Sequence, residues 1–73
     1  MPVLRLHIGA MGCRRCVREV SALLRDVAGV RLVTAEARGK TVTIVGEMMT
    51  EQVLAAFGGT PYRPRLIEVA AED

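Results

Sequence analysis

Two β-strand patterns follow each other near the middle of this chain, and they limit the folds that it can adopt. Residues 30–37 place Val33, Ala35 and Ala37 on one face, and residues 41–45 are β-branched throughout. Residues of this kind favour extended backbone. The intervening Arg38-Gly39-Lys40 has the composition of a turn. We therefore predict an antiparallel hairpin over residues 30–45.

A strand and an amphipathic helix are predicted before this hairpin. Residues 3–8 are apolar at alternate positions, which is typical of a half-buried strand. Residues 14–27 instead carry apolar side chains at helical spacing, at Val17, Val20, Leu23, Leu24 and Val27. Gly29 supplies a stop signal for that helix.

A second helix and a last strand are predicted after the hairpin. Thr50 is a suitable N-cap, and Gly58-Gly59 ends the helix. The apolar side of this helix comprises Val53, Leu54, Ala56 and Phe57. Residues 62–69 resemble a strand, and Pro64 near its start favours a sheet edge or a start near Arg65. We expect residues 70–73 to form a frayed polar tail.

The order βαββαβ predicts an α+β, ferredoxin-like fold, in which two helices pack on one face of a four-stranded antiparallel sheet. With 73 residues, we expect a single domain over residues 1–73. Hydrophobic residues make up 51% of the chain, and Phe57 and Tyr62 are its only two aromatic residues, so the core is expected to be aliphatic.

Composition and terminal sequence favour a cytoplasmic protein that does not insert into membranes. No apolar run approaches the ~18 residues of a membrane span, and no signal-peptide pattern is visible at the N-terminus. Two cysteines without a secretory signal indicate a reducing compartment.

The chain's two cysteines, Cys13 and Cys16, lie where the first strand pattern gives way to the first helix. Unpaired N–H groups at a helix N-terminus favour anions, and Arg14, Arg15 and Arg18 add positive charge. Both effects favour thiolate over thiol. Two neighbouring thiolates can share a soft metal ion such as Cu(I) or close a disulfide. A merely buried, inert role fits poorly with a loop flanked by glycine and arginine.

Other potential ligands are fewer and weaker. A structural zinc site needs four protein ligands, and His7 is expected on the exposed face of the first strand. Met11 is a possible third soft ligand, but its position in the loop favours packing in the core.

The stretch Met11-Gly12-Cys13-Arg14-Arg15-Cys16 between a strand and a helix of a βαββαβ chain resembles the metal loop of the heavy-metal-associated domain. That family comprises small copper chaperones and the N-terminal metal-binding domains of heavy-metal P-type ATPases. The resemblance extends over essentially the whole chain, including Gly29-Val30 and Val42-Thr43-Ile44. It implies that Cys13 and Cys16 bind Cu(I), that Met11 packs beneath the loop, and that Tyr62 shields the site.

The sequence departs from the family pattern around this loop. Ala10 and Pro61 replace glycines that are usual before the methionine and the tyrosine. Gly12 stands where the family usually has Thr, Ser, His or Asp. An aspartate there would supply a hard oxygen ligand suited to Zn(II) or Cd(II), so the absence of an aspartate favours Cu(I). The Arg14-Arg15 pair is unusually basic for this loop.

We therefore predict a metal carrier that is not an enzyme and that delivers Cu(I) by thiolate ligand exchange. The expected partner is a heavy-metal P-type ATPase or another copper-accepting protein, and Arg14, Arg15 and Arg18 would dock its acidic surface. The carrier is expected to be a monomer, or a dimer bridged by metal. Nucleic-acid binding is disfavoured, because no aromatic residue interleaves with the arginines.

Two alternatives share the cysteine pair. One is a zinc- or mercury-binding version of the same domain. The other is a small glutaredoxin-like thiol–disulfide oxidoreductase. Thr60-Pro61 resembles the threonine-proline pair that precedes a strand in that family. The predicted hairpin and the 12 residues after Pro61 disfavour this enzyme.

Overall fold

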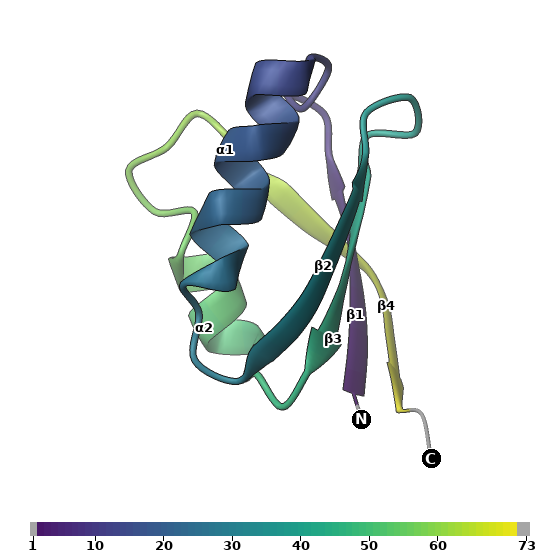
Figure 1. Cartoon of the computed structure of the whole chain (residues 1–73), viewed down its shortest axis with the longest axis vertical. Coiled ribbons are helices and arrows are strands. Elements are labelled where there is room, and N and C mark those ends of the chain that lie inside the picture. Colours follow the sequence, from purple (N-terminus) through teal and green to yellow (C-terminus); the bar gives the residue numbers. More distant parts are fainter. Residues whose placement is uncertain (1, 72–73) are drawn as a thin grey trace.

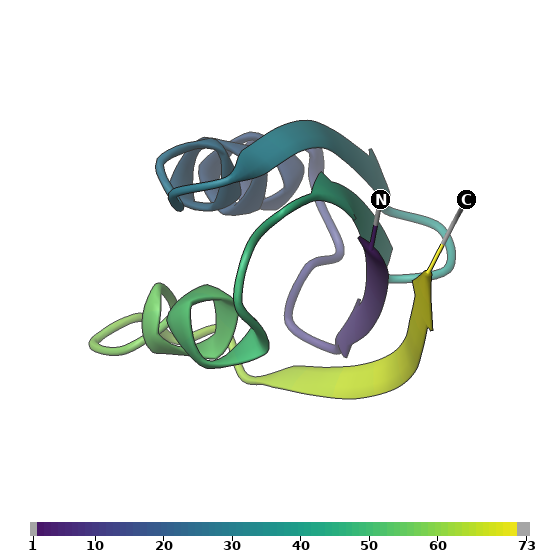
Figure 2. The ribbon, with the colours of Figure 1, turned by 90° about the horizontal axis from the view of Figure 1, so that it is seen from below.

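A computed structural model of the chain describes residues 2–71. Six elements follow one another: β1 (Pro2–Ile8), α1 (Arg14–Arg25), β2 (Val30–Glu36), β3 (Thr41–Gly46), α2 (Thr50–Ala55) and β4 (Pro64–Ala71). The strands form one antiparallel sheet in the order β2-β3-β1-β4. Both helices cover the same face of this sheet (Figures 1 and 2). This is the predicted ferredoxin-like fold.

The core lies between the sheet and the helices. It is aliphatic apart from Phe57 and Tyr62, as predicted from the composition. Its buried members are Leu4, Leu6, Ile8, Met11, Val20, Leu24, Val42, Ile44, Met48, Val53, Phe57 and Tyr62. None of the described helices is both long enough and apolar enough to span a membrane.

Two glycines allow the loops at one end of the sheet to come together. Gly29 has φ +88° and Gly46 has φ +154°. The backbone N–H of Glu47 donates a hydrogen bond to the Gly29 carbonyl at 2.8 Å. A Cβ at Gly29 would lie 2.6 Å from the carbonyl oxygen of Glu47, so a side chain is excluded there. The loop between Cys13 and β1 is at the other end of α1 (Figure 1).

Three predicted helix boundaries were wrong. Helix α1 ends at Arg25 with Asp26 as its C-cap, before Val27. Helix α2 ends at Ala55, so Ala56 and Phe57 follow it. Its N-cap is Met49, without a side-chain hydrogen bond, and Thr50 is its first helical residue.

The physical reason for this helix start is the neighbouring side chain. Met48 is buried with Val53 in the core, at the two positions of a hydrophobic staple. The residue between Met48 and the helix is therefore Met49, whose carbonyl accepts hydrogen bonds from Gln52 and Val53. Leu54, expected on the apolar side, is 38% exposed.

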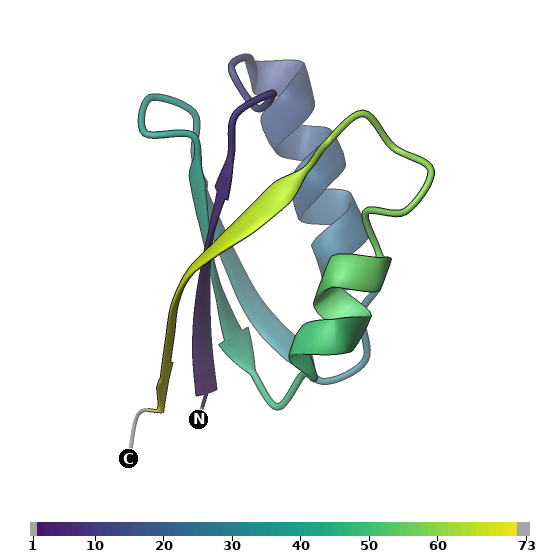
Figure 3. The ribbon, with the colours of Figure 1, turned by 180° about the vertical axis from the view of Figure 1, so that it is seen from behind.

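The last strand occupies a sheet edge, as Pro64 indicated, and it begins at Pro64 itself (Figure 3). The strand continues through Ala71, because Val3 pairs with Ala70 and Pro2 with Ala71. The predicted tail at residues 70–73 was therefore wrong for its first two residues, and residues 72–73 lie outside the described part of the chain.

Candidate metal centre

The loop between β1 and α1 is fastened to the core by Met11. Its side chain is fully buried, and its backbone N–H donates a 3.0 Å hydrogen bond to the Ile8 carbonyl. The next two residues, Gly12 and Cys13, are exposed. The buried Met11 side chain therefore anchors the loop to the core, and the loop exposes the Cys13 thiol to solvent.

Cys13 is the N-cap of α1, and Cys16 lies in the first turn of this helix. The Cys16 backbone N–H donates a hydrogen bond to Cys13 Sγ at 3.2 Å, so sulfur takes the place of the usual capping oxygen. Both cysteines are free thiols. Cys13 is exposed, whereas Cys16 is half-buried and packs against the core. The start of the helix therefore places an exposed thiol, Cys13, beside a half-buried thiol, Cys16.

The surroundings of Cys16 favour its thiolate. A hydrogen bond from the Cys13 side chain is the main cause that lowers the pKa of Cys16, with smaller contributions from the Tyr62 hydroxyl and from backbone N–H groups. Burial opposes this lowering of the pKa. We expected the arginines to contribute, but the causes at Cys16 are hydrogen bonds, and Arg14, Arg15 and Arg18 are exposed.

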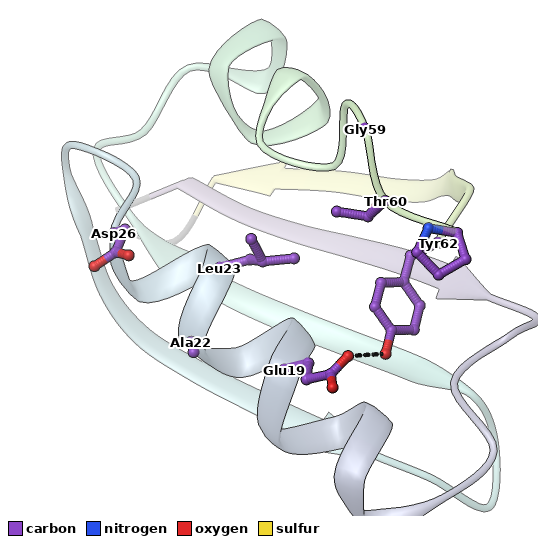
Figure 4. Close-up of a pocket in the computed structure, with 8 residues that line it drawn as sticks. Glu19, Ala22, Leu23, Asp26, Gly59, Thr60 and Tyr62 are labelled. Carbon is purple, nitrogen blue, oxygen red and sulfur yellow. Dashed lines mark hydrogen bonds between the residues drawn. The ribbon is translucent and has the colours of Figure 1, made fainter.

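Tyr62 comes to this site from the segment between α2 and β4. Its side chain is buried, and its hydroxyl donates a 2.7 Å hydrogen bond to Glu19 Oε2 (Figure 4). This bond to a carboxylate is the main reason why the pKa of Tyr62 is raised above its usual range. The phenol therefore remains a hydrogen-bond donor next to Cys16.

Sequence reasoning missed Glu19. The residue lies one helical turn after Cys16, and that spacing, together with a tyrosine expected near the loop, is the signal that could have identified it. Glu19 Oε1 also lies 3.6 Å from Arg15 Nε. Of the three arginines near the cysteines, Arg15 is thus paired within the chain. Arg14 and Arg18 border a hollow of about 310 Å³ between α1 and the end of β2.

Lys40 was also missed, although it is the only lysine of the chain. It has φ +54° in the turn between β2 and β3, and its carbonyl accepts a 2.8 Å hydrogen bond from the Ile8 N–H. Its Cε lies 4.0 Å from the position that a Cβ on Gly12 would occupy. The register that pairs His7 with Thr41 brings this turn beside the metal loop.

The available donor set is small. Residues 2–71 contain no cluster of three or more His, Cys, Asp or Glu side chains that could hold a metal ion. His7 lies on β1 between Leu6 and Ile8, whose side chains enter the core, so it belongs to the opposite face of the sheet. The two thiols are the exposed or half-buried soft donors of the loop, and thiolates select soft and borderline ions such as Cu(I) and zinc over hard cations.

Comparison with known proteins places this geometry in context. No protein-family model matches the sequence, and no curated protein matches it. Solved structures do match. The copper(I)-loaded first domain of the human copper chaperone for SOD1 shares 26% identity over 93% of this chain and 94% of that domain, with a TM-score of 0.80.

Two further structures show the same fold at lower identity. The N-terminal domain of ZntA in its Zn(II) form shares 22% identity over 96% of this chain and 97% of that domain, with a TM-score of 0.83. Oxidized MerP from Ralstonia metallidurans CH34 shares 15% identity over 93% of this chain and all of that protein, with a TM-score of 0.84. These are heavy-metal-associated domains, which confirms the resemblance seen in the sequence.

Proposed function

We propose that this chain, whose fold is that of the heavy-metal-associated domains, binds Cu(I) between Cys13 and Cys16 and delivers it to another protein. The observation that carries this proposal is the pair of free thiols at the start of α1, joined through the 3.2 Å contact from Cys16 N–H to Cys13 Sγ. Two thiolates satisfy a soft monovalent ion, whereas a structural zinc site takes four protein ligands.

Delivery proceeds by exchange of ligands, without oxidation or reduction. A thiolate of the acceptor attacks the bound ion and forms a three-coordinate intermediate that bridges the two proteins. The ion leaves Cys13 first, because this thiol is exposed. A second thiolate of the acceptor then binds the ion and displaces Cys16, which is half-buried against the core. The Tyr62 hydroxyl covers the inner side of the site, and the buried Met11 keeps the loop in place.

The acceptor in this scheme carries an acidic surface, and exposed Arg14, Arg15 and Arg18 orient the encounter. A heavy-metal P-type ATPase is one such acceptor. Similar structures include a copper-binding domain from the P-type ATPase HMA7, with 17% identity and a TM-score of 0.85. A reducing cytoplasm, which keeps both thiols free, is the proposed location.

The test is a competitive titration of the reduced protein with Cu(I), Zn(II) and Hg(II) in the presence of a strong chelator, read by native mass spectrometry. We expect one Cu(I) per monomer, held against a chelator concentration that removes Zn(II). The spectrum also separates this monomer from a dimer bridged by one ion. Preference for Zn(II) over Cu(I) would contradict the proposal.

A further inference from the structure

A groove runs along the side of α1, next to the candidate metal centre. It has a volume of about 410 Å³ and lies between α1 and the segment 59–62 (Figure 4). Ala22, Leu23 and Pro61 give it an apolar lining, and two carboxylates lie on its helical wall, Glu19 within α1 and Asp26 at the C-cap of α1. These carboxylates are seven residues apart, which corresponds to ~10 Å along a helix.

The carboxylate nearer the metal loop is held in a fixed orientation. Tyr62, which also lines the groove, donates its 2.7 Å hydrogen bond to Glu19 Oε2. The other oxygen faces Arg15, but that pair is 3.6 Å apart and the Arg15 side chain is 89% exposed, so a second cation can replace it at little cost. Asp26 forms no ion pair within residues 2–71. The groove therefore combines an apolar floor with negative charge that is weakly compensated.

We propose that this groove receives a basic side chain of the protein with which the chain exchanges metal, an inference that rests on the proposed function. The aliphatic stem of an arginine or lysine lies on the apolar lining, and its cation lies against Glu19, with Asp26 farther along the same wall adding negative charge. The chain thus presents two opposite charges to one partner: Arg14 and Arg18 beside the thiols, and the groove along the same helix.

A surface that carries both positive and negative charge discriminates between partners in addition to attracting an acidic protein. A partner that is acidic throughout meets repulsion at the groove, whereas one with a basic residue at the matching distance fits in a single orientation. That orientation brings the acceptor's thiols to Cys13. The groove accordingly selects partners and fixes the angle of docking.

The groove is tested by NMR titration of the reduced protein with N-acetyl-arginine amide, and with N-acetyl-citrulline amide as its uncharged counterpart. We expect saturable shifts at Leu23, Thr60 and Tyr62 with the arginine compound only. Asp26→Asn and Glu19→Gln each weaken the binding roughly two- to fivefold, as for partly exposed charge pairs. Glu51→Gln, which removes an exposed carboxylate of α2 outside the groove, leaves it unchanged.

Equal shifts with both compounds, or shifts that Asp26→Asn does not weaken, would overturn the proposal. Circular dichroism of each variant checks that it is folded, and Asp26→Asn alone suffices if Glu19→Gln is unstable. Cu(I) stoichiometry of the wild-type chain is measured in parallel. Arginine binding without Cu(I) binding refutes the proposed function, whereas Cu(I) binding without arginine binding refutes only the groove.

Discussion

The Tyr62 hydroxyl donates a 2.7 Å hydrogen bond to the Glu19 carboxylate and thereby ties the segment before β4 to the second turn of α1. Because Tyr62 also helps to lower the pKa of Cys16, one phenol connects the metal loop, the helix and the groove. Several consequences of this arrangement can be measured.

Removal of the hydroxyl in Tyr62→Phe is expected to raise the pKa of Cys16, because this hydroxyl contributes to lowering that pKa. The rate of alkylation at Cys16 as a function of pH, measured in a Cys13→Ser background for both proteins, reports this pKa. The same substitution lowers the free energy of unfolding by about 1 kcal/mol at neutral pH. An unchanged alkylation profile would show that Tyr62 does not act on the thiol.

The raised pKa of Tyr62 also predicts a dependence on alkaline pH. A tyrosine whose pKa is higher in the folded than in the unfolded state stabilises the fold fully below the unfolded value of ~10, and this contribution is lost as pH rises further. The difference in unfolding free energy between wild type and Tyr62→Phe is therefore constant near neutrality and shrinks once the pH exceeds the unfolded pKa of ~10. Urea unfolding at a series of pH values measures it.

Charge reversal in Arg14→Glu/Arg18→Glu is expected to slow Cu(I) transfer to an acidic acceptor domain roughly tenfold at low salt and to reduce the salt dependence of the rate. Cu(I) affinity stays largely unchanged, because both side chains are exposed. Arg31→Glu, an exposed position on β2, is the matched control. Stopped-flow transfer rates over a range of ionic strength test this, and a rate unaffected at low salt would exclude docking by these arginines.

Gly12→Asp is expected to raise Zn(II) affinity by adding a hard oxygen ligand beside Cys13. Gly12 does not adopt a positive φ, so the change is sterically allowed. Lys40 Cε lies 4.0 Å from the new Cβ, so its ammonium competes with the metal for the carboxylate. The double variant Gly12→Asp/Lys40→Met therefore binds Zn(II) more tightly than the single one. A chromophoric chelator measures both affinities, and the reverse order would contradict the placement of Lys40.

The fold could be predicted from the sequence largely because its periodic segments are unambiguous. The β-branched run of β3 and the apolar spacing of α1 both have the expected structure. The start of α2 was mispredicted, because the burial of Met48 outweighs the capping preference of Thr50. Local propensity contains no information about such a tertiary contact.

The two thiols of the site could be placed from their spacing, and Met11 and Tyr62 from the family resemblance, but Glu19 and Lys40 could not. Glu19 meets Tyr62 from one helical turn beyond Cys16, and Lys40 reaches Gly12 through the register of the strands, so each depends on how the elements pack. The cause of the lowered pKa at Cys16 was misjudged for the same reason. The sequence shows that arginines are near Cys16 along the chain. The hydrogen bond from Cys13 depends on how the two cysteine side chains are placed in space, which the sequence does not show.

The central claim is that Cys13 and Cys16 alone provide the protein ligands of Cu(I). X-ray absorption spectroscopy at the copper edge of the loaded monomer tests it most directly. Two sulfur neighbours, with no nitrogen or oxygen, are expected in the wild type, and Cys13→Ser and Cys16→Ser each lose tight binding. A nitrogen or oxygen ligand in the wild type, or tight binding that survives either substitution, would contradict the account.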